Sequence, residues 1–168
     1  MPLFARIAFA AVDFAARKGL AAPSAGDSGT ESGKHRAQRT GVRGETYAYW
    51  YLRRQGYVVV ARNYMSPGMK GEIDLVGYDG QVLAFVEVKT RSAQESSPSK
   101  NPAPLLPTPE QAVNWEKRRN LKRMARLFLR ARRADPGTCR FDVLAIETNR
   151  GAPPQVRLHK GAFHFGTD

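Results

Sequence analysis

Residues 71–91 read GEIDLVGYDGQVLAFVEVKTR, and this stretch decides the predicted fold. Two strands are predicted here, over 72–78 and 82–90, and Asp79-Gly80 between them is a hairpin signal. The second strand begins with five apolar residues in succession, which is typical of a strand buried on both faces. A further strand, YVVVA at 57–61, precedes them, so the three strands predict an antiparallel meander.

The sequence on either side supplies helices and further strands. Apolar residues at helical or alternating spacing, with turn residues around them, define a helix over 44–55, a strongly basic helix over about 110–133, and strands over 140–146 and 155–159. The order of these elements predicts an α/β fold in which a mixed sheet of four to five strands is flanked by helices.

The predicted domain, over 41–168, has irregular segments before it and within it. Residues 1–18 predict an amphipathic helix that docks on its own domain, on a partner or on a membrane surface. Asp13 argues against a signal peptide or a transit presequence because it interrupts the apolar stretch. Residues 19–40, rich in Gly and Ser, predict a flexible linker, and residues 91–109, with five prolines and four serines, predict a mobile loop.

The composition restricts the class of protein. The 168 residues contain no apolar run near the roughly 18 residues that span a bilayer, so no transmembrane segment is expected. Cys139 is the single cysteine, which excludes an intrachain disulfide and fits a reducing compartment such as the cytoplasm. The net charge of +12 favours a polyanionic partner, with nucleic acid first and an acidic membrane surface second.

Two carboxylates and a lysine are the candidate chemical groups of the meander. Strand alternation puts Glu87 and Lys89 on one face, and it puts Asp74 opposite to the face of Ile73 and Leu75. The hairpin brings Asp74 within reach of Glu87, where two partly buried carboxylates would repel each other and lose solvation. A divalent cation such as Mg²⁺ or Mn²⁺ would remove both costs. The alternatives are an ordinary cross-strand ion pair and a carboxylate that caps a turn.

Glu45 is a further candidate on the predicted helix over 44–55. It precedes Ala48, Tyr49 and Leu52 at helical spacing, so it should point toward the sheet rather than toward water. The alternative is a glutamate that the helix dipole favours at a helix start.

The basic helix is the candidate nucleic-acid surface. Residues 115–133 contain nine Lys or Arg residues and one acidic residue. The positive side chains repel one another, and a bound polyphosphate would relieve that repulsion. A solvated helix face is the alternative. The expected contacts are Lys117, Arg118, Arg119, Lys122, Arg123 and Arg126. Four aromatic residues could stack on unpaired bases, although core packing is expected for at least half of them: Trp115, Tyr47, Trp50 and Tyr51.

The spacing Asp74…Glu87-Val88-Lys89 resembles the PD-(D/E)xK nuclease signature, although Ile73 stands where that signature has proline. An ordered set of motifs also resembles the YraN-like family of predicted endonucleases, which are distantly similar to archaeal Holliday-junction resolvases. These motifs are GxxGE at 41–45, RN at 62–63, GEIDLV at 71–76, FVEVKTR at 85–91 and RFDV at 140–143. Residues 1–40 and the loop after Arg91 are longer than is usual in that family.

The resemblance implies a restriction-endonuclease-like fold and a site. Asp74 and Glu87 would bind Mg²⁺ or Mn²⁺, Glu45 would be an additional ligand, and Lys89 would be the catalytic lysine. The expected function is a structure-selective DNA endonuclease that acts on branched or single-stranded DNA, as a homodimer if it cuts both strands of a junction. The alternative is a catalytically idle nucleic-acid-binding platform for DNA-processing partners.

Overall fold

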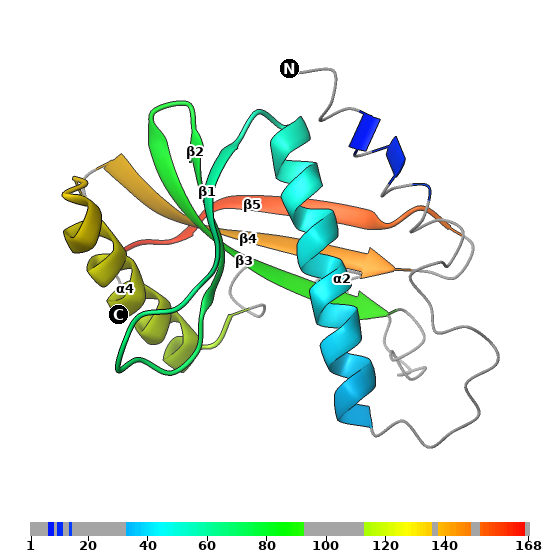
Figure 1. The fold of residues 1–168 in the computed structure, drawn as a ribbon, viewed down its shortest axis with the longest axis horizontal. Helices are drawn as coiled ribbons and strands as arrows, with labels where there is room; N and C mark the ends of the chain where they lie inside the picture. The colour runs from blue at the N-terminus through cyan, green and yellow to red at the C-terminus, as the bar shows by residue number, and fades with distance from the viewer. Residues whose placement is uncertain are drawn as a thin grey trace.

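Five strands form one mixed sheet in the order β1-β2-β3-β4-β5 (Figure 1). The computed structural model describes residues 7, 8, 10, 11, 14, 33–92, 113–135, 138–148 and 152–166. The strands are β1 (Val58–Tyr64), β2 (Ile73–Asp79), β3 (Val82–Ser92), β4 (Cys139–Thr148) and β5 (Gln155–Phe163). Neighbouring strands are antiparallel except for β3 and β4, which are parallel. The predicted α/β class, the meander and the fifth strand are confirmed.

Two helices, α2 (Gly33–Arg54) and α4 (Trp115–Arg132), pack on opposite faces of the sheet (Figure 1). Alternate residues of β3 divide between the two cores, with Phe85 on the α4 side and Val86 on the α2 side. The predicted apolar stripe of the basic helix is buried in the α4 core, and its members are Leu121, Met124, Ala125, Phe128 and Leu129. The helix that connects β3 to β4 therefore covers one face of the sheet, as a crossover between parallel strands usually does.

The first helix differs from its predicted bounds. It begins at Gly33 rather than at residue 44, so residues 33–40 are helical and the linker prediction was wrong there. The stretch KHRAQRT contains mostly good helix formers, whereas the glycine content around it had favoured a linker. Gly44 lies inside the helix at a place where a larger residue would not fit, because a Cβ atom there would lie 1.9 Å from Thr90 Oγ1. Residues 19–32 of the predicted linker lie outside the described residues.

Smaller corrections concern a turn and two segments. The β2–β3 turn centres on Gly80 and Gln81 rather than on Asp79-Gly80, since Asp79 pairs with Val82. β3 continues to Ser92, and residues 93–109 of the predicted loop lie outside the described residues. Within 1–18 the described residues are helical, and the large apolar side chains among them are exposed; the other residues of this segment lie outside the description. Among the described residues, no helix combines the length and apolar character needed to cross a membrane.

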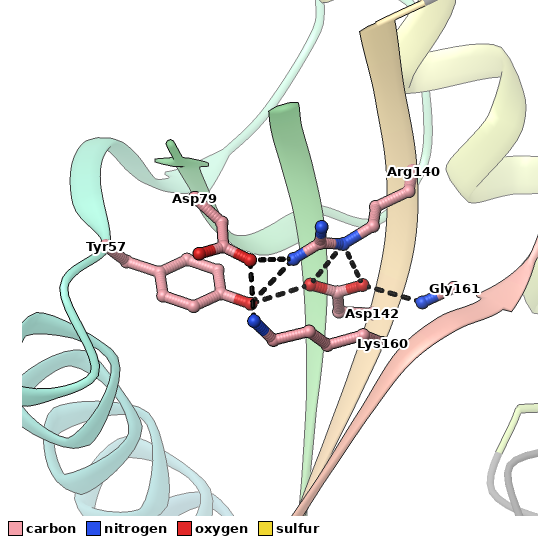
Figure 2. A network of polar contacts seen from close by, with 6 residues as sticks. All are labelled: Tyr57, Asp79, Arg140, Asp142, Lys160 and Gly161. Atoms are coloured by element: carbon pink, nitrogen blue, oxygen red, sulfur yellow. Dashed lines mark hydrogen bonds and ion pairs between the residues drawn. The ribbon is translucent and has the colours of Figure 1, made fainter. Parts of the chain in front are cut away.

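A buried polar network joins three strands and the connection between α2 and β1 (Figure 2). Asp142 on β4 is fully buried, and its carboxylate accepts hydrogen bonds from Tyr57 Oη at 3.1 Å, Arg140 Nε at 2.9 Å and Gly161 N at 2.9 Å. Arg140 also donates to Tyr57 Oη and to Asp79. Burial raises the pKa of Tyr57, and the charge of Asp142 raises it further, so the phenol stays a donor. The network therefore neutralises a carboxylate inside the sheet.

Replacing Asp142 by Ala should lower the free energy of unfolding by about 3–5 kcal/mol, because the change leaves partners of a buried ion pair without their acceptor. Urea denaturation measures this loss. Lys160→Ala is the matched control, since its ammonium lies 2.6 Å from Asp79 but its side chain is 50% exposed. That pair should contribute about 1 kcal/mol or less. Equal losses in the two variants would contradict the structural role of Asp142.

Candidate functional site

Asp74 and Glu87 form a buried carboxylate pair between β2 and β3. Asp74 and Glu87 are the chain neighbours of the paired residues Leu75 and Val86, and the charge of Glu87 acts on Asp74. The exposed fractions are only 8% for Asp74 and 3% for Glu87. Burial and, after it, the charge of Glu87 raise the pKa of Asp74 to about 7, although Asp74 Oδ2 accepts a hydrogen bond from Val88 N at 2.6 Å, which lowers it. The predicted proximity of the two carboxylates is confirmed.

Two lysines contact Glu87. Lys89 Nζ lies 2.9 Å from Glu87 Oε1, so these two residues share a face as alternation predicted. Lys117 Nζ, from the first turn of α4, lies 3.3 Å from Glu87 Oε2. That oxygen is buried and makes no hydrogen bond, although it takes part in this ion pair. One oxygen of the pair is therefore under-coordinated.

Glu45 lies near the pair, and a neighbouring strand residue binds one of its oxygens. Its Oε2 accepts a hydrogen bond from Asn63 Nδ2 at 2.7 Å. Its charge contributes to the raised pKa of Asp74, behind burial and the effect of Glu87. Within the described part of the chain, no three His, Cys, Asp or Glu side chains gather closely enough to hold a metal ion. The structure thus brings together Asp74, Glu87 and Lys89 and leaves Glu45 at their margin.

The alternation predicted for β2 is wrong around Asp74. Leu75 is packed in the α2-side core, whereas Ile73, two residues away, is packed in the α4-side core. In a regular strand these side chains would share a face. The strand therefore changes face at Asp74, a local feature that residue types alone do not encode.

The donor set fits a hard divalent cation. Both carboxylates are buried, one of their oxygens lacks a hydrogen bond, and the raised pKa of Asp74 records the cost of holding two negative charges there. Carboxylate oxygens are the ligands that Mg²⁺ and Mn²⁺ prefer. Asp74 and Glu87 are thus the residues that would hold such an ion.

The structure divides the predicted nucleic-acid contacts into groups. Arg119, Arg123 and Arg126 are exposed along α4. Lys122 is only 2% exposed, so it does not belong to that surface, and the charge count that selected it took no account of the packing of the helix. Arg118 is partly buried, and its Nε donates to Val113 O at 2.8 Å.

The aromatic candidates also separate. Tyr47 is buried in the α2-side core, and Trp50 and Tyr51 are partly buried against it. Trp115 is 67% exposed at the first residue of α4. The helix begins there, later than the predicted residue 110, because the Asn114 side chain accepts from Lys117 N at 2.9 Å and caps it. Trp115 is therefore the aromatic of the four that remains open to an outside partner.

Residues 44–146 match the family described as "Uncharacterised protein family UPF0102", which is the YraN-like group. The chain belongs to this family. A UPF0102 protein of Koribacter versatilis is 39% identical over 125 residues, which are 74% of this chain and 79% of that relative. A UPF0102 protein of Solibacter usitatus is 44% identical over 120 residues, which are 71% of this chain and 82% of that relative. One of Symbiobacterium thermophilum is 39% identical over 128 residues, with 76% and 98% coverage.

The UPF0102 segment contains two residues whose place at the site sequence reasoning missed. Lys117 was predicted as a nucleic-acid contact, yet it lies against Glu87. Asn63 was noted only within a family motif, yet it binds Glu45. The helical spacing of Lys117 with Leu121 and Met124, which are both buried, was a signal that this lysine faces the sheet.

In chelator, Asp74→Asn should make the protein more stable at neutral pH. The folded-state pKa of Asp74 is about 7, above the unfolded value of about 4. The folded protein therefore keeps a proton that the unfolded chain loses, and stability falls as pH rises through this window. Asparagine keeps an oxygen for Val88 N without the charge. The difference in free energy of unfolding between Asp74→Asn and wild type should be absent near pH 4 and reach a few kcal/mol near pH 8. Thermal unfolding measures this difference.

Asp79→Asn is the control with the opposite sign. Hydrogen bonds from Arg140 and Lys160 hold the pKa of Asp79 below its usual range. Its charge therefore stabilises the fold above the unfolded pKa, and this contribution is lost in acid. The variant should be less stable than wild type at neutral pH, with a difference that shrinks on acidification. Parallel profiles for both variants would contradict the assignment of the Asp74 pKa.

Proposed function

We propose that this UPF0102 protein is a Mg²⁺-dependent, structure-selective DNA endonuclease. The observation that carries the proposal is the buried pair of Asp74 and Glu87 with Lys89 2.9 Å from Glu87. Burial of two like charges is costly, and a cation relieves that cost. A lysine beside the same carboxylate provides the group that hydrolysis of a phosphodiester would use. Family membership supports the proposal only through the resemblance of the family to nucleases.

In the proposed reaction, water attacks the scissile phosphorus and the 3′ oxygen leaves, which gives a 5′-phosphate end. Asp74 and Glu87 would hold the ion, and the chemistry supplied there when Mg²⁺ is bound would be a water of lowered pKa and positive charge beside the phosphate. Lys89 orients the attacking water or stabilises the extra negative charge of the transition state as a compact cation. Lys117, 3.3 Å from Glu87, adds a second positive charge on the side of α4.

The surface of α4 supports a nucleic-acid substrate. Arg119 and Arg123 follow Trp115 at intervals of four residues, so the three positions lie along one outer stripe of the helix. Phosphates would bind the arginines, and an unpaired base would stack on the indole. This arrangement favours branched or single-stranded DNA over a continuous duplex. Cleavage of both strands of a junction would take a homodimer.

A second candidate function is a catalytically idle nucleic-acid-binding platform. The observation that favours it is the position of Lys89 and Lys117, which neutralise Glu87 without any ion. A site whose charge is balanced by two lysines can persist as part of the fold. The two functions differ in what substitution of Lys89 does.

Lys89→Ala should abolish cleavage of labelled branched and single-stranded DNA in Mn²⁺, while DNA affinity stays within about three-fold of wild type. Lys89 acts on the transition state in the proposed reaction, so ground-state binding should change little. Glu87→Gln should also stop cleavage, but higher Mn²⁺ should restore part of it because a ligand has been weakened. Chelator is the negative control. If wild type binds these substrates but cuts none of them with any divalent metal, the endonuclease function is wrong and the platform function remains.

Replacing Arg119, Arg123 and Arg126 by Ala should weaken DNA binding for all sequences alike. The slope of log affinity against log salt should become less steep by about 0.9 for each duplex phosphate that the variant no longer neutralises. Fluorescence anisotropy over a salt series measures this slope.

A matched control removes the same charge from the opposite side of the sheet. Arg53, Arg54 and Arg62 lie on α2 and β1, and their replacement by Ala should leave the slope near that of wild type. Equal changes in the two triple variants would mean that net charge, rather than the α4 surface, governs binding.

A further inference from the structure

Asn63 has an unusual backbone conformation inside a paired strand. Its φ is +48°, and among the described residues Arg133 is the other non-glycine residue with positive φ. Arg133 is the C-cap of α4, where a left-handed residue is ordinary. Asn63, by contrast, has paired residues on both sides, since Arg62 pairs with Leu75 and Tyr64 pairs with Ile73. A turn or a helix end therefore does not account for its conformation.

The left-handed residue coincides with a change of face in the strand. The Arg62 guanidinium lies 4.8 Å from the ring centroid of Tyr49 on α2. Tyr64 packs edge-on against Phe128 of α4, with ring centroids 4.9 Å apart. Two residues that would share a face in a regular strand therefore point to opposite helices. The register sets Asn63 across from Asp74, where β2 changes face in the same way.

This point of the sheet is where groups from the two faces converge. Glu45 comes from α2, and Glu87 contacts Lys117 of α4. Asn63 lies between Arg62 and Tyr64, whose partners flank Asp74, and Asp74 in turn accepts a hydrogen bond from the residue after Glu87. The charge of Glu45 acts on Asp74, and the amide of Asn63 holds Glu45 Oε2 at 2.7 Å. The hydrogen bond occupies one carboxylate oxygen of Glu45 and fixes the orientation of the other.

We propose that Asn63 is a positioning residue that orients Glu45 toward the ion held by Asp74 and Glu87. The inference rests on the proposed function. The left-handed conformation of Asn63 aims its side-chain amide at α2, and the amide keeps Glu45 beside the carboxylate pair. Asparagine suits this place because it tolerates positive φ and carries an amide donor.

A double-mutant cycle on Mn²⁺ affinity, measured by calorimetry without DNA, tests the inference. Asn63→Gly removes the amide and keeps a residue that adopts φ +48° readily. It should weaken Mn²⁺ binding about 10–100-fold, as loss of a residue that orients a ligand typically does. Glu45→Ala should weaken it at least as much, and the double variant should match Glu45→Ala because Asn63 acts through Glu45. Melting in chelator should be nearly unchanged for Asn63→Gly.

The outcomes separate this inference from the proposed function. If wild type binds Mn²⁺ and Asp74→Asn does not, but Asn63→Gly keeps wild-type affinity, the positioning role is wrong and the metal site stands. The positioning role would also be wrong if Asn63→Gly weakened Mn²⁺ binding as much in the Glu45→Ala variant as it does in wild type. Wild type that binds no Mn²⁺ contradicts the metal site and this inference together. Glu45→Ala removes the same hydrogen bond from its other end, so the test does not depend on the folding of one variant.

Discussion

The cost of burying carboxylates in a β-sheet governs this molecule. Asp142 and the pair of Asp74 and Glu87 are all buried, yet they are treated differently. Asp142 is surrounded by an arginine, a phenol and a backbone N–H, so every part of its charge is compensated by the chain itself. The pair is compensated only in part, because one oxygen of Glu87 lacks a hydrogen bond, and burial with the charge of Glu87 raises the pKa of Asp74 to about 7. The charge of Asp142 is therefore balanced by its neighbours, whereas the pair keeps one oxygen without a hydrogen bond.

Sequence reasoning reached the fold and the central pair because both depend on short-range rules. Apolar alternation and a turn signal define the hairpin, and the hairpin brings Asp74 to Glu87. The same rules failed at Ile73, whose side was predicted from strict alternation. The strand changes face there beside a left-handed residue on its neighbour, and nothing in the residue types of β2 announces such a change.

The remaining differences come from tertiary packing. Lys122 and Lys117 were counted as charges on a helix, but α4 is pressed against the sheet, so one lysine is buried and the other reaches Glu87. A charge count cannot distinguish these from Arg119, which is exposed. Sequence patterns likewise did not predict the buried network around Asp142, since its members come from separate strands and meet only when the sheet is complete. Long-range assembly, rather than local propensity, decides these positions.

The close approach of Gly44 to Thr90 has a mechanical consequence for the site. Each residue is the chain neighbour of a candidate site residue, since Gly44 precedes Glu45 and Thr90 follows Lys89. The close contact between the helix and the strand thus lies directly beside the positions from which both side chains extend. A single methyl group inserted there would act as a wedge, and it would change the spacing of the two groups without altering either of them. The distance between Glu45 and Lys89 therefore depends on the absence of a side chain at residue 44.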